Sequence, residues 1–293
     1  MSANLTTAAD EFAAERPRLF GIAYRMLGSR ADADDVLQDA WLRWRESETQ
    51  ALRSTQAWLT TIVTRLAIDR LRSAKARREV YVGPWLPEPL AEVDLATPES
   101  HAELASDLSI AFLNLLERLG PEERAAFVLH DVFECDYDEI ANVLSKSEAA
   151  CRQLVHRARD RVTAERKRFK VDEPARLRML ERFIDAANHG DLTALKSLFA
   201  PEAQLISDGG GKALAVRRIL HGAERIARLW HAIFRRNLTP ERRIVRINGE
   251  LGLETRYRGK LHSVTTIDTD GEHIHTYYTL ANPDKLSAFR GEQ

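Results

Sequence analysis

Cysteine is almost absent from the sequence. Cys135 and Cys151 are the only two among 293 residues, they are not spaced as C-x-x-C, and no group of histidines accompanies them. This pattern excludes a disulfide framework and a structural zinc site, and it is typical of proteins in a reducing compartment. We therefore expect no metal and no cofactor. Cys151 lies among apolar positions of a helical pattern and is expected to be part of a core.

Long apolar runs are also missing. No stretch approaches the roughly 18 residues that a membrane-spanning helix needs. The N-terminus lacks a basic start followed by an apolar segment. We expect a cytoplasmic protein that does not bind membranes.

The chain has almost no net charge. Its 43 basic and 44 acidic side chains give a formal charge of -1, which by itself does not favour a nucleic-acid binder. The charges are strongly segregated, however. Residues 65–78 contain six basic side chains and one acid, residues 152–170 contain eight and two, and residues 87–107 contain six acids and neither Lys nor Arg. Two basic blocks separated by an acidic segment indicate two DNA-facing surfaces joined by a linker.

Residues from about Pro17 to Val80 have the apolar periodicity of helices. Apolar side chains recur every three or four positions, and acids at the start of the second segment suit a helix N-terminus. The sequence predicts three helices. The first ends at Gly28-Ser29, the second covers residues 32–46 and the third covers about 55–78. Together they are expected to form a small bundle, the first domain, over residues 1–82.

An acidic linker is predicted over residues 83–104. Four prolines lie between positions 83 and 98, and proline removes backbone donors and discourages regular structure. Helical periodicity then resumes and continues to about residue 168, with breaks at Gly120-Pro121 and around 145–147. A second helical domain is therefore expected over residues 105–170.

The pattern changes after Pro174. Two helices are expected first, over 176–189 and 191–199. Five segments rich in β-forming residues follow, and a helix at about 222–236 interrupts them. The predicted strands are 203–207, 244–247, 253–257, 261–268 and 273–280. We expect a curved α+β sheet with helices on one side over residues 175–293, and Asp270-Gly271 predicts a hairpin turn.

Residues 138–161 have the pattern of a helix-turn-helix. A short amphipathic helix precedes a tight turn over 145–147, and Ser147 suits the cap of a second helix. On the second helix the apolar positions share one face, and polar and basic residues lie opposite. Because Arg and Gln reach base edges or phosphates in the major groove, we interpret it as a recognition helix rather than a solvated basic helix. The predicted contact residues are Lys146, Arg152, Gln153, His156 and Arg157.

Two segments of the first domain resemble region 2 of the sigma factors. The run from Asp32 to Asp39, followed by Ala-Trp-Leu-Arg-Trp, resembles the D-A-E-D-L-V-Q-E-x-F-L-R-x-W signature, the surface that grips the clamp helices of RNA polymerase. The resemblance implies that Asp35, Gln38 and Asp39 bind polymerase, and a solvated acidic face is the alternative. The run from 57 to 72 resembles the helix that melts promoters and reads the minus-ten element.

A minus-ten helix needs side chains that hold unpaired bases and basic groups that hold phosphates. The candidates of these types are Trp58, Thr60, Thr61, Thr64, Arg65 and Arg72. Trp58 also suits a core position, and we favour the core for it.

Residues 105–169 resemble sigma region 4, which reads the minus-thirty-five element. The segment 119–129, Leu-Gly-Pro-Glu-Glu-Arg-Ala-Ala-Phe-Val-Leu, and the helix-turn-helix after it carry this resemblance. Gln153-Leu154 stand where many relatives have Ser-Arg. The base preference of the family therefore does not transfer to this chain.

Three short motifs resemble the extracytoplasmic-function (ECF) sigma subgroup with a SnoaL-like extension. They are Trp85-Leu86-Pro87-Glu88-Pro89, Asp208-Gly209-Gly210-Gly211-Lys212 and Asn282-Pro283-Asp284-Lys285-Leu286. In that subgroup the extension is held to regulate the sigma core, and promoters carry T-G-T-C-A-like and C-G-T-C-like elements. The resemblance implies a multidomain chain, with two all-α sigma domains followed by an α+β SnoaL/NTF2-like cone. It implies core RNA polymerase, through its clamp helices and flap, and promoter DNA as partners.

The cone also raises the possibility of catalysis, because many SnoaL-like relatives are enzymes with carboxylate or histidine acid–base groups. The available groups are Asp208, His221, Glu254, His262, Asp268, His273 and His275. Their spacing defines no dyad, and the glycine motif lacks the spacing of a phosphate loop.

We therefore expect an alternative sigma factor that is not an enzyme and whose C-terminal domain modulates its activity, with an unknown small ligand in the cone left open. One alternative is a sigma-like DNA-binding regulator with an enzymatic or ligand-sensing tail. Another is a conventional repressor or activator that uses only the helix-turn-helix.

Overall fold

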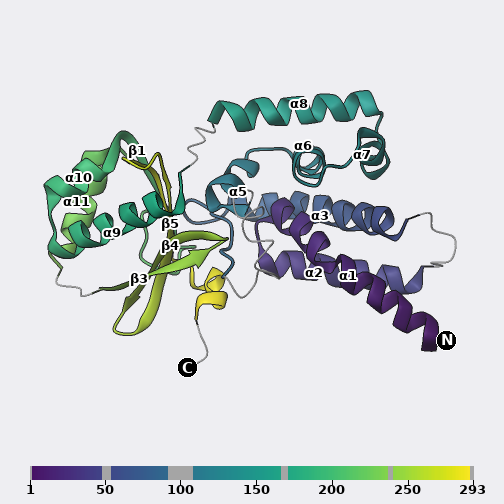
Figure 1. Cartoon of the computed structure of the whole chain (residues 1–293), viewed down its shortest axis with the longest axis horizontal. Coiled ribbons are helices and arrows are strands. Elements are labelled where there is room, and N and C mark those ends of the chain that lie inside the picture. Colours follow the sequence, from purple (N-terminus) through teal and green to yellow (C-terminus); the bar gives the residue numbers. More distant parts are fainter. Residues whose placement is uncertain (1, 48–53, 92–107, 166–170, 237–239, 291–293) are drawn as a thin grey trace. The chain divides into compact units, whose positions relative to one another are not determined.

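The structure is a computed structural model that describes residues 2–47, 54–91, 108–165, 171–236 and 240–290 (Figure 1). The chain divides into two compact units. The first contains Met1–Glu79 and Leu113–Lys167, and the second contains Val80–Phe112 and Arg168–Gln293. The described part of the predicted linker, residues 83–91, is therefore part of the second unit. The rest of that linker, 92–104, lies outside the described residues.

Three helices open the first unit, and all three were predicted. They are α1 (Ser2–Leu27), α2 (Arg30–Glu46) and α3 (Thr55–Glu79), and α1 packs against both of the others. Helix α1 ends where Gly28 adopts a φ of 63°. Ser29 then caps α2, since its hydroxyl accepts from the amide of Asp32 at 3.2 Å. The buried residues of α2 are Ala33, Val36, Leu37, Ala40 and Trp44.

The second helical segment contains α6 (Pro121–Phe127), a π-helical turn (Val128–Val132), α7 (Tyr137–Leu144) and α8 (Glu148–Glu165), and α5 (Ile110–Leu116) precedes them. The predicted breaks near 120 and 145 are confirmed. A further break at Glu134, which adopts a left-handed φ of 54°, was not predicted. Asp136 is the N-cap of α7, and its amide donates to the Glu139 carboxylate at 3.2 Å. Within the described ranges, no helix is both long and apolar enough to cross a bilayer.

A six-stranded sheet forms the centre of the second unit. Its strands are β1 (Phe199–Asp208), β2 (Leu220–His221), β3 (Pro240–Ile247), β4 (Glu250–Tyr257), β5 (Lys260–Thr269) and β6 (Ile274–Leu280), in the order β2-β1-β6-β5-β4-β3. The β1–β6 pair is parallel and the other pairs are antiparallel. The five predicted strands are confirmed, and the two-residue β2 was missed.

Helices α9 (Glu173–His189), α10 (Leu192–Leu198) and α11 (Ala223–Phe234) cover one face of the sheet (Figure 1). Aromatic rings pack in this layer: the ring centroid of Phe183 lies 5.1 Å from that of Trp230 and 5.0 Å from that of Tyr277. Neighbouring residues of a strand point to opposite faces, so Tyr278 belongs to a second core. That core also contains Leu86 and Ile110, so the segment that connects the two helical regions covers the other face.

Candidate functional site

Helix α8 has one face that packs against the rest of the first unit and one face that is exposed. Ser147 caps it as predicted, since its hydroxyl accepts from the amide of Ala150 at 3.2 Å. The buried side chains of the helix are Cys151, Leu154, Val155, Ala158 and Val162. The exposed ones include Arg152, Gln153, His156 and Arg157, the four predicted contact residues of this helix. The packed face fixes the orientation of the helix, and the opposite face has the side chains that a recognition helix needs.

Acidic residues hold several of the basic side chains of this surface. Lys146 lies 3.1 Å from Glu122, Arg152 lies 2.6 Å from Glu148, and Arg157 lies 3.2 Å from Glu123. The basic side chains of these pairs are 33–55% exposed, whereas Glu123 is only 13% exposed. Pairs in which both partners reach solvent contribute little to stability. The same guanidinium and ammonium groups are available to phosphate once the carboxylates are displaced.

The predicted minus-ten residues of α3 differ in exposure. Trp58 is half-buried, with its ring centroid 5.4 Å from that of Trp44, in line with the core position we favoured. Thr60 and Thr64 are buried, whereas Arg65 and Arg72 are exposed and Thr61 is half-buried. In this arrangement the two buried threonines do not face solvent. Their contact with DNA remains a prediction that requires the helix to be uncovered.

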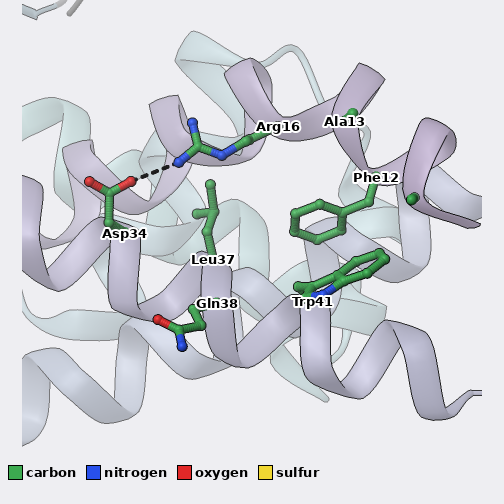
Figure 2. A pocket seen from close by; sticks show the side chains of 8 residues that line it. Phe12, Ala13, Arg16, Asp34, Leu37, Gln38 and Trp41 are labelled. Atoms are coloured by element: carbon green, nitrogen blue, oxygen red, sulfur yellow. Dashed lines mark hydrogen bonds and ion pairs between the residues drawn. The ribbon is translucent and has the colours of Figure 1, made fainter.

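The acidic face of α2 is exposed, as a polymerase-binding surface requires. Asp35, Gln38 and Asp39 are all exposed, and Asp35 accepts a hydrogen bond from Arg70 at 2.5 Å. A groove of about 520 Å³ lies beside this face, between α1 and α2. The rings of Trp41 and Phe12 lie next to each other at this groove, with centroids 5.3 Å apart and an edge-on contact (Figure 2).

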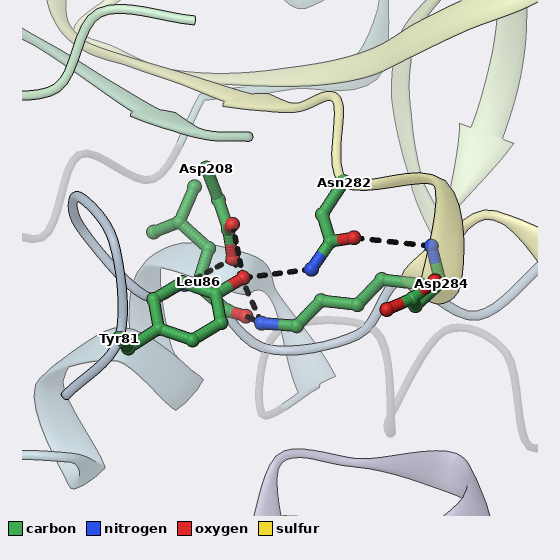
Figure 3. A network of polar contacts seen from close by, with 6 residues as sticks. Tyr81, Leu86, Asp208, Asn282 and Asp284 are labelled. Atoms are coloured by element: carbon green, nitrogen blue, oxygen red, sulfur yellow. Dashed lines mark hydrogen bonds and ion pairs between the residues drawn. The ribbon is translucent and has the colours of Figure 1, made fainter. Parts of the chain in front are cut away.

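The three motifs of the connecting segment and the C-terminal domain converge in the second unit. Asp208, at the end of β1, is fully buried, and one of its oxygens accepts from the amide of Leu86 at 2.9 Å (Figure 3). The ammonium of Lys285 lies 2.8 Å from the same oxygen and donates to the carbonyl of Leu86 at 2.5 Å. It also lies 4.0 Å from the ring centroid of Trp85, a cation–π contact. One residue of each motif therefore meets at one buried ion pair.

Tyr81 is a member of this network that the sequence interpretation missed. Its hydroxyl donates to Asp208 at 2.5 Å and accepts from the side-chain amide of Asn282 at 2.7 Å (Figure 3). Burial and the hydrogen bond to Asp208 raise the pKa of Tyr81 well above its usual value, so the phenol remains a donor. Its position just before the W-L-P-E-P motif was the available signal.

The glycine motif brings its loop close to the C-terminal motif. Gly210 has a φ of 58°, and a Cβ atom there would lie 2.3 Å from the side-chain nitrogen of Asn282. Lys212 forms an ion pair with Asp284. The loop of the glycine motif is thus a tight turn whose backbone lies close to the C-terminal motif, as expected of consecutive glycines.

Asn248 is a second residue that the sequence interpretation missed. It is buried, its side chain accepts from the amide of Leu90 at 2.8 Å, and it donates to the carbonyl of Leu108 at 2.7 Å. The two described parts of the connecting segment, before residue 92 and after residue 107, are therefore tied to one side chain. The Asn248-Gly249 pair is itself a strong hairpin signal, which lies between β3 and β4.

Comparisons with known proteins agree with this organisation. Residues 12–77 match the family Sigma-70 region 2, and residues 109–162 match the family Sigma-70, region 4. The ECF RNA polymerase sigma factor SigJ of Mycobacterium tuberculosis (strain ATCC 25618 / H37Rv) is 39% identical over 289 residues, which cover 94% of this chain and 92% of that protein. This chain belongs to the ECF sigma factors.

The solved structures support the same family for the whole chain. The crystal structure of M. tuberculosis SigJ matches with a TM-score of 0.77 at 35% identity, over 96% of this chain and 98% of that chain. The probable ECF sigma factor SigI of M. tuberculosis (strain CDC 1551 / Oshkosh) is 36% identical over 191 residues, which cover 64% of this chain and 65% of that protein. The predicted fold class, two helical sigma domains followed by an α+β domain, is confirmed.

This ECF sigma factor is an alternative sigma factor and not an enzyme, as predicted. Three of the acid–base candidates of the C-terminal domain form separate ion pairs or close contacts. Asp208 holds Lys285, Glu254 pairs with Arg256 at 2.6 Å, and His275 lies 2.8 Å from Asp270. Among the residues that the structure describes, no group of three or more His, Cys, Asp or Glu side chains is placed to hold a metal ion.

Proposed function

We propose that this sigma factor directs core RNA polymerase to promoters through two DNA-reading helices and one polymerase-binding helix. The exposed face of α8 carries the proposal, because Gln153, His156 and Arg157 project from a helix whose opposite face is buried. In this proposal α8 reads the minus-thirty-five element and α3 holds the minus-ten element. The exposed acids of α2 bind the clamp helices of the polymerase, and the helix-turn-helix domain binds its flap.

We further propose that the C-terminal domain regulates the sigma core through the connecting segment. The buried pair of Asp208 and Lys285 holds both the amide and the carbonyl of Leu86, and Asn248 holds Leu90 and Leu108. A segment held in this way has a restricted path between the two sigma regions. A change in the network alters the reach of one region relative to the other, and therefore promoter use.

Reconstituted transcription tests both proposals. Core polymerase and the purified chain are supplied with promoters that carry T-G-T-C-A-like and C-G-T-C-like elements. Lys285→Met removes the bonds to Asp208 and Leu86, and Lys212→Met is the matched control because its pair with Asp284 is 58% exposed on both sides. We expect Lys285→Met to change the transcript yield, and Lys212→Met to leave it unchanged.

The outcomes separate the two proposals. Absence of transcripts from native protein and from both variants contradicts promoter-directed initiation. Transcripts in equal yield from all three proteins contradict regulation through the network and leave initiation standing. A ligand-sensing cone gains no support from the described residues, because aromatic rings such as Phe183, Trp230 and Tyr277 pack on one another between helices and sheet.

A further inference from the structure

The guanidinium of Arg152 in α8 lies over the ring of Tyr137, the first residue of α7. Its central carbon is 5.0 Å from the ring centroid, within the range of a cation–π contact. Arg152 follows the buried Cys151 and precedes the buried Val155 by three positions, so it lies at the border between the packed and the exposed face of α8. A predicted base-reading side chain of the second helix of the helix-turn-helix therefore contacts an aromatic ring of the first helix.

The ring of Tyr137 is itself held in place by its neighbours. Its centroid lies 4.4 Å from that of His130, in the π-helical turn. Nδ1 of His130 donates to the carbonyl of Cys135 at 3.0 Å, because a carbonyl oxygen only accepts. Asp136, the residue before Tyr137, is the N-cap of α7. The ring is therefore fixed by the turn on one side and by the start of the helix on the other.

A separate ion pair holds α8 to the same turn. Arg159, two helical turns beyond Arg152, donates three hydrogen bonds to the carboxylate of Asp131 at 2.7–3.1 Å. The hydrogen bond to Asp131 raises the pKa of Arg159, and the charge of that carboxylate adds to the effect. This pair ties α8 to the turn independently of Arg152. Loss of the contact between Arg152 and Tyr137 therefore does not release the helix.

Glu148 and Tyr137 contact different parts of the Arg152 guanidinium. The carboxylate of Glu148 accepts from Nη2 of Arg152 at 2.6 Å, so it uses an in-plane donor. An aromatic ring contacts the face of a guanidinium and leaves the in-plane donors available. Both Arg152 and Glu148 are exposed, so their ion pair is weak. The O6 and N7 acceptors of a guanine can replace this carboxylate while the ring contact is retained.

An arginine that is ordered before binding loses less freedom when it binds. A long side chain that is free in solvent gives up rotamer entropy at an interface, and this loss weakens the contact. The loss matters most for a bidentate contact with guanine, which requires two donors in one orientation at once. A contact with phosphate accepts more orientations and carries no sequence information. Order imposed on Arg152 should therefore act on base discrimination more than on total affinity.

We propose that Tyr137 is a positioning residue for base recognition, whose ring holds the guanidinium of Arg152 in the orientation that reads guanine at one position of the minus-thirty-five element. The proposal deepens the proposed function and rests on it for the assignment of α8 as the reading helix. Tyr137 itself needs no contact with DNA, because its effect passes through Arg152.

Promoter binding by reconstituted holoenzyme tests this role. Core polymerase with each full-length variant is bound to a library in which every position of the minus-thirty-five element is varied. Discrimination is the ratio of the affinities for guanine and for the other bases at each position. Tyr137→Leu and Tyr137→Met remove the ring and keep an apolar side chain, whereas Tyr137→Phe keeps the ring. Tyr137→Leu is also combined with Arg152→Ala, and Glu148→Gln is the control that removes the other partner of Arg152.

The expected changes concern a single base pair. Arg152→Ala should lower guanine discrimination there by about five- to one-hundred-fold. Tyr137→Leu and Tyr137→Met should lower it at the same position by about two- to five-fold, the range of an exposed cation–π contact, with little change elsewhere. Tyr137→Phe and Glu148→Gln should retain native discrimination. In the Arg152→Ala background, Tyr137→Leu should cause no further loss.

Four results would overturn the role of Tyr137. The first is native discrimination in both variants that lack the ring. The second is an equal loss in Tyr137→Phe, which would assign the effect to the hydroxyl. The third is a further loss in the Arg152→Ala background, which would show that the ring acts by another route. The fourth is a lowered melting temperature in both Tyr137→Leu and Tyr137→Met, which would make Tyr137 a structural support of the domain.

A failure of the proposed function gives a different result. If Arg152 does not read a base, Arg152→Ala itself leaves discrimination unchanged at every position, and the role of Tyr137 is overturned with it. If Arg152→Ala lowers discrimination and the variants that lack the ring do not, only the role of Tyr137 is overturned.

Discussion

The ammonium of Lys285 lies 2.8 Å from a carboxylate oxygen of Asp208, and the Asp208 side chain is fully buried. The two residues are 77 positions apart and join the end of β1 to the short helix after β6. The same carboxylate binds the amide of Leu86 in the connecting segment. This ion pair is therefore one of the contacts that hold the segment on the C-terminal domain, together with the hydrogen bonds of Asn248.

The first prediction concerns the charge of Asp208. Asp208→Asn keeps the size of the side chain but leaves the ammonium of Lys285 without its anionic partner. Breaking a buried pair on one side is strongly destabilising, and we expect a loss of about 3 kcal/mol in the free energy of unfolding of the second unit. Hydrogen exchange of the amides in 80–90, followed in urea, reports on this unit separately from the first.

Asp284→Asn provides the control for this substitution. Asp284 is 58% exposed and pairs with the equally exposed Lys212, so its loss should change stability by less than about 0.5 kcal/mol. Equal effects of the two substitutions would show that the buried pair does not hold the connecting segment.

The second prediction concerns the glycine loop. Alanine at Gly210 places a Cβ atom 2.3 Å from the Asn282 side chain and displaces the amide that donates to Tyr81. Gly259→Ala is a matched control, because Gly259 also has a positive φ, of 74°, but a Cβ atom there would have no neighbouring atom within 4 Å. We expect a loss of about 1 kcal/mol for Gly259→Ala from backbone strain alone. Gly210→Ala should lose about 1–2 kcal/mol more from the broken buried hydrogen bond, measured by urea unfolding. If the two variants lost the same free energy of unfolding, the contact with Asn282 would not explain why position 210 is glycine.

Most of the fold could be predicted because its elements have regular apolar periodicity. Helices α2 and α3 and strands β4 to β6 follow patterns of three to four or of two residues. The elements that were not predicted are those whose structure depends on backbone geometry and not on the periodicity of apolar side chains. Glu134, just beyond the π-helical turn, adopts a left-handed conformation, and β2 has only two residues, too few for a pattern.

The site could be predicted only in part, because its contacts are distant in sequence. The three motifs were recognised, but Leu86 and Asp208 are separated by 122 positions and Tyr81 and Asn282 by 201. No local pattern indicates such pairs. The burial of Thr60 and Thr64 could not be predicted either, since it depends on how α3 packs in the tertiary structure.

The third prediction is a pH dependence at the β5–β6 turn. Burial raises the pKa of Asp270, but hydrogen bonds from His275 and from the amides of His273 and Glu272 outweigh burial and lower the pKa to about 2. The folded pKa is below the ordinary value of 3.8, so the carboxylate stabilises the fold above about pH 4. This contribution, about 1–2 kcal/mol after solvent screening, is lost as the pH falls from about 4 to about 2.

Asp270→Asn isolates this contribution. The amide oxygen keeps the two backbone hydrogen bonds of the turn, and only the pairing with His275 is lost. Stability of the second unit should then depend less on pH between 2 and 4, in acid titrations followed by circular dichroism. Glu272→Gln, at an exposed position of the same turn, should retain the native slope. Partial burial raises the pKa of Glu250 and of Asp268, so these two carboxyls favour the folded state more as the pH falls and cannot produce the expected loss.

The last prediction concerns base recognition by α8. Gln153 is exposed and lies opposite the buried face of α8, and glutamine reads adenine through two hydrogen bonds in the major groove. Gln153→Ala should therefore lower discrimination at one base pair of the minus-thirty-five element by about 1–3 kcal/mol, with little change at the others. Lys146→Ala should weaken binding to all sequences and reduce its salt dependence, because an ammonium contacts phosphate without reading bases. Thr163→Ala, at an exposed position further along α8, serves as the control. Binding measured across a library of minus-thirty-five sequences distinguishes these outcomes, and an unchanged preference in Gln153→Ala would remove Gln153 from the reading face.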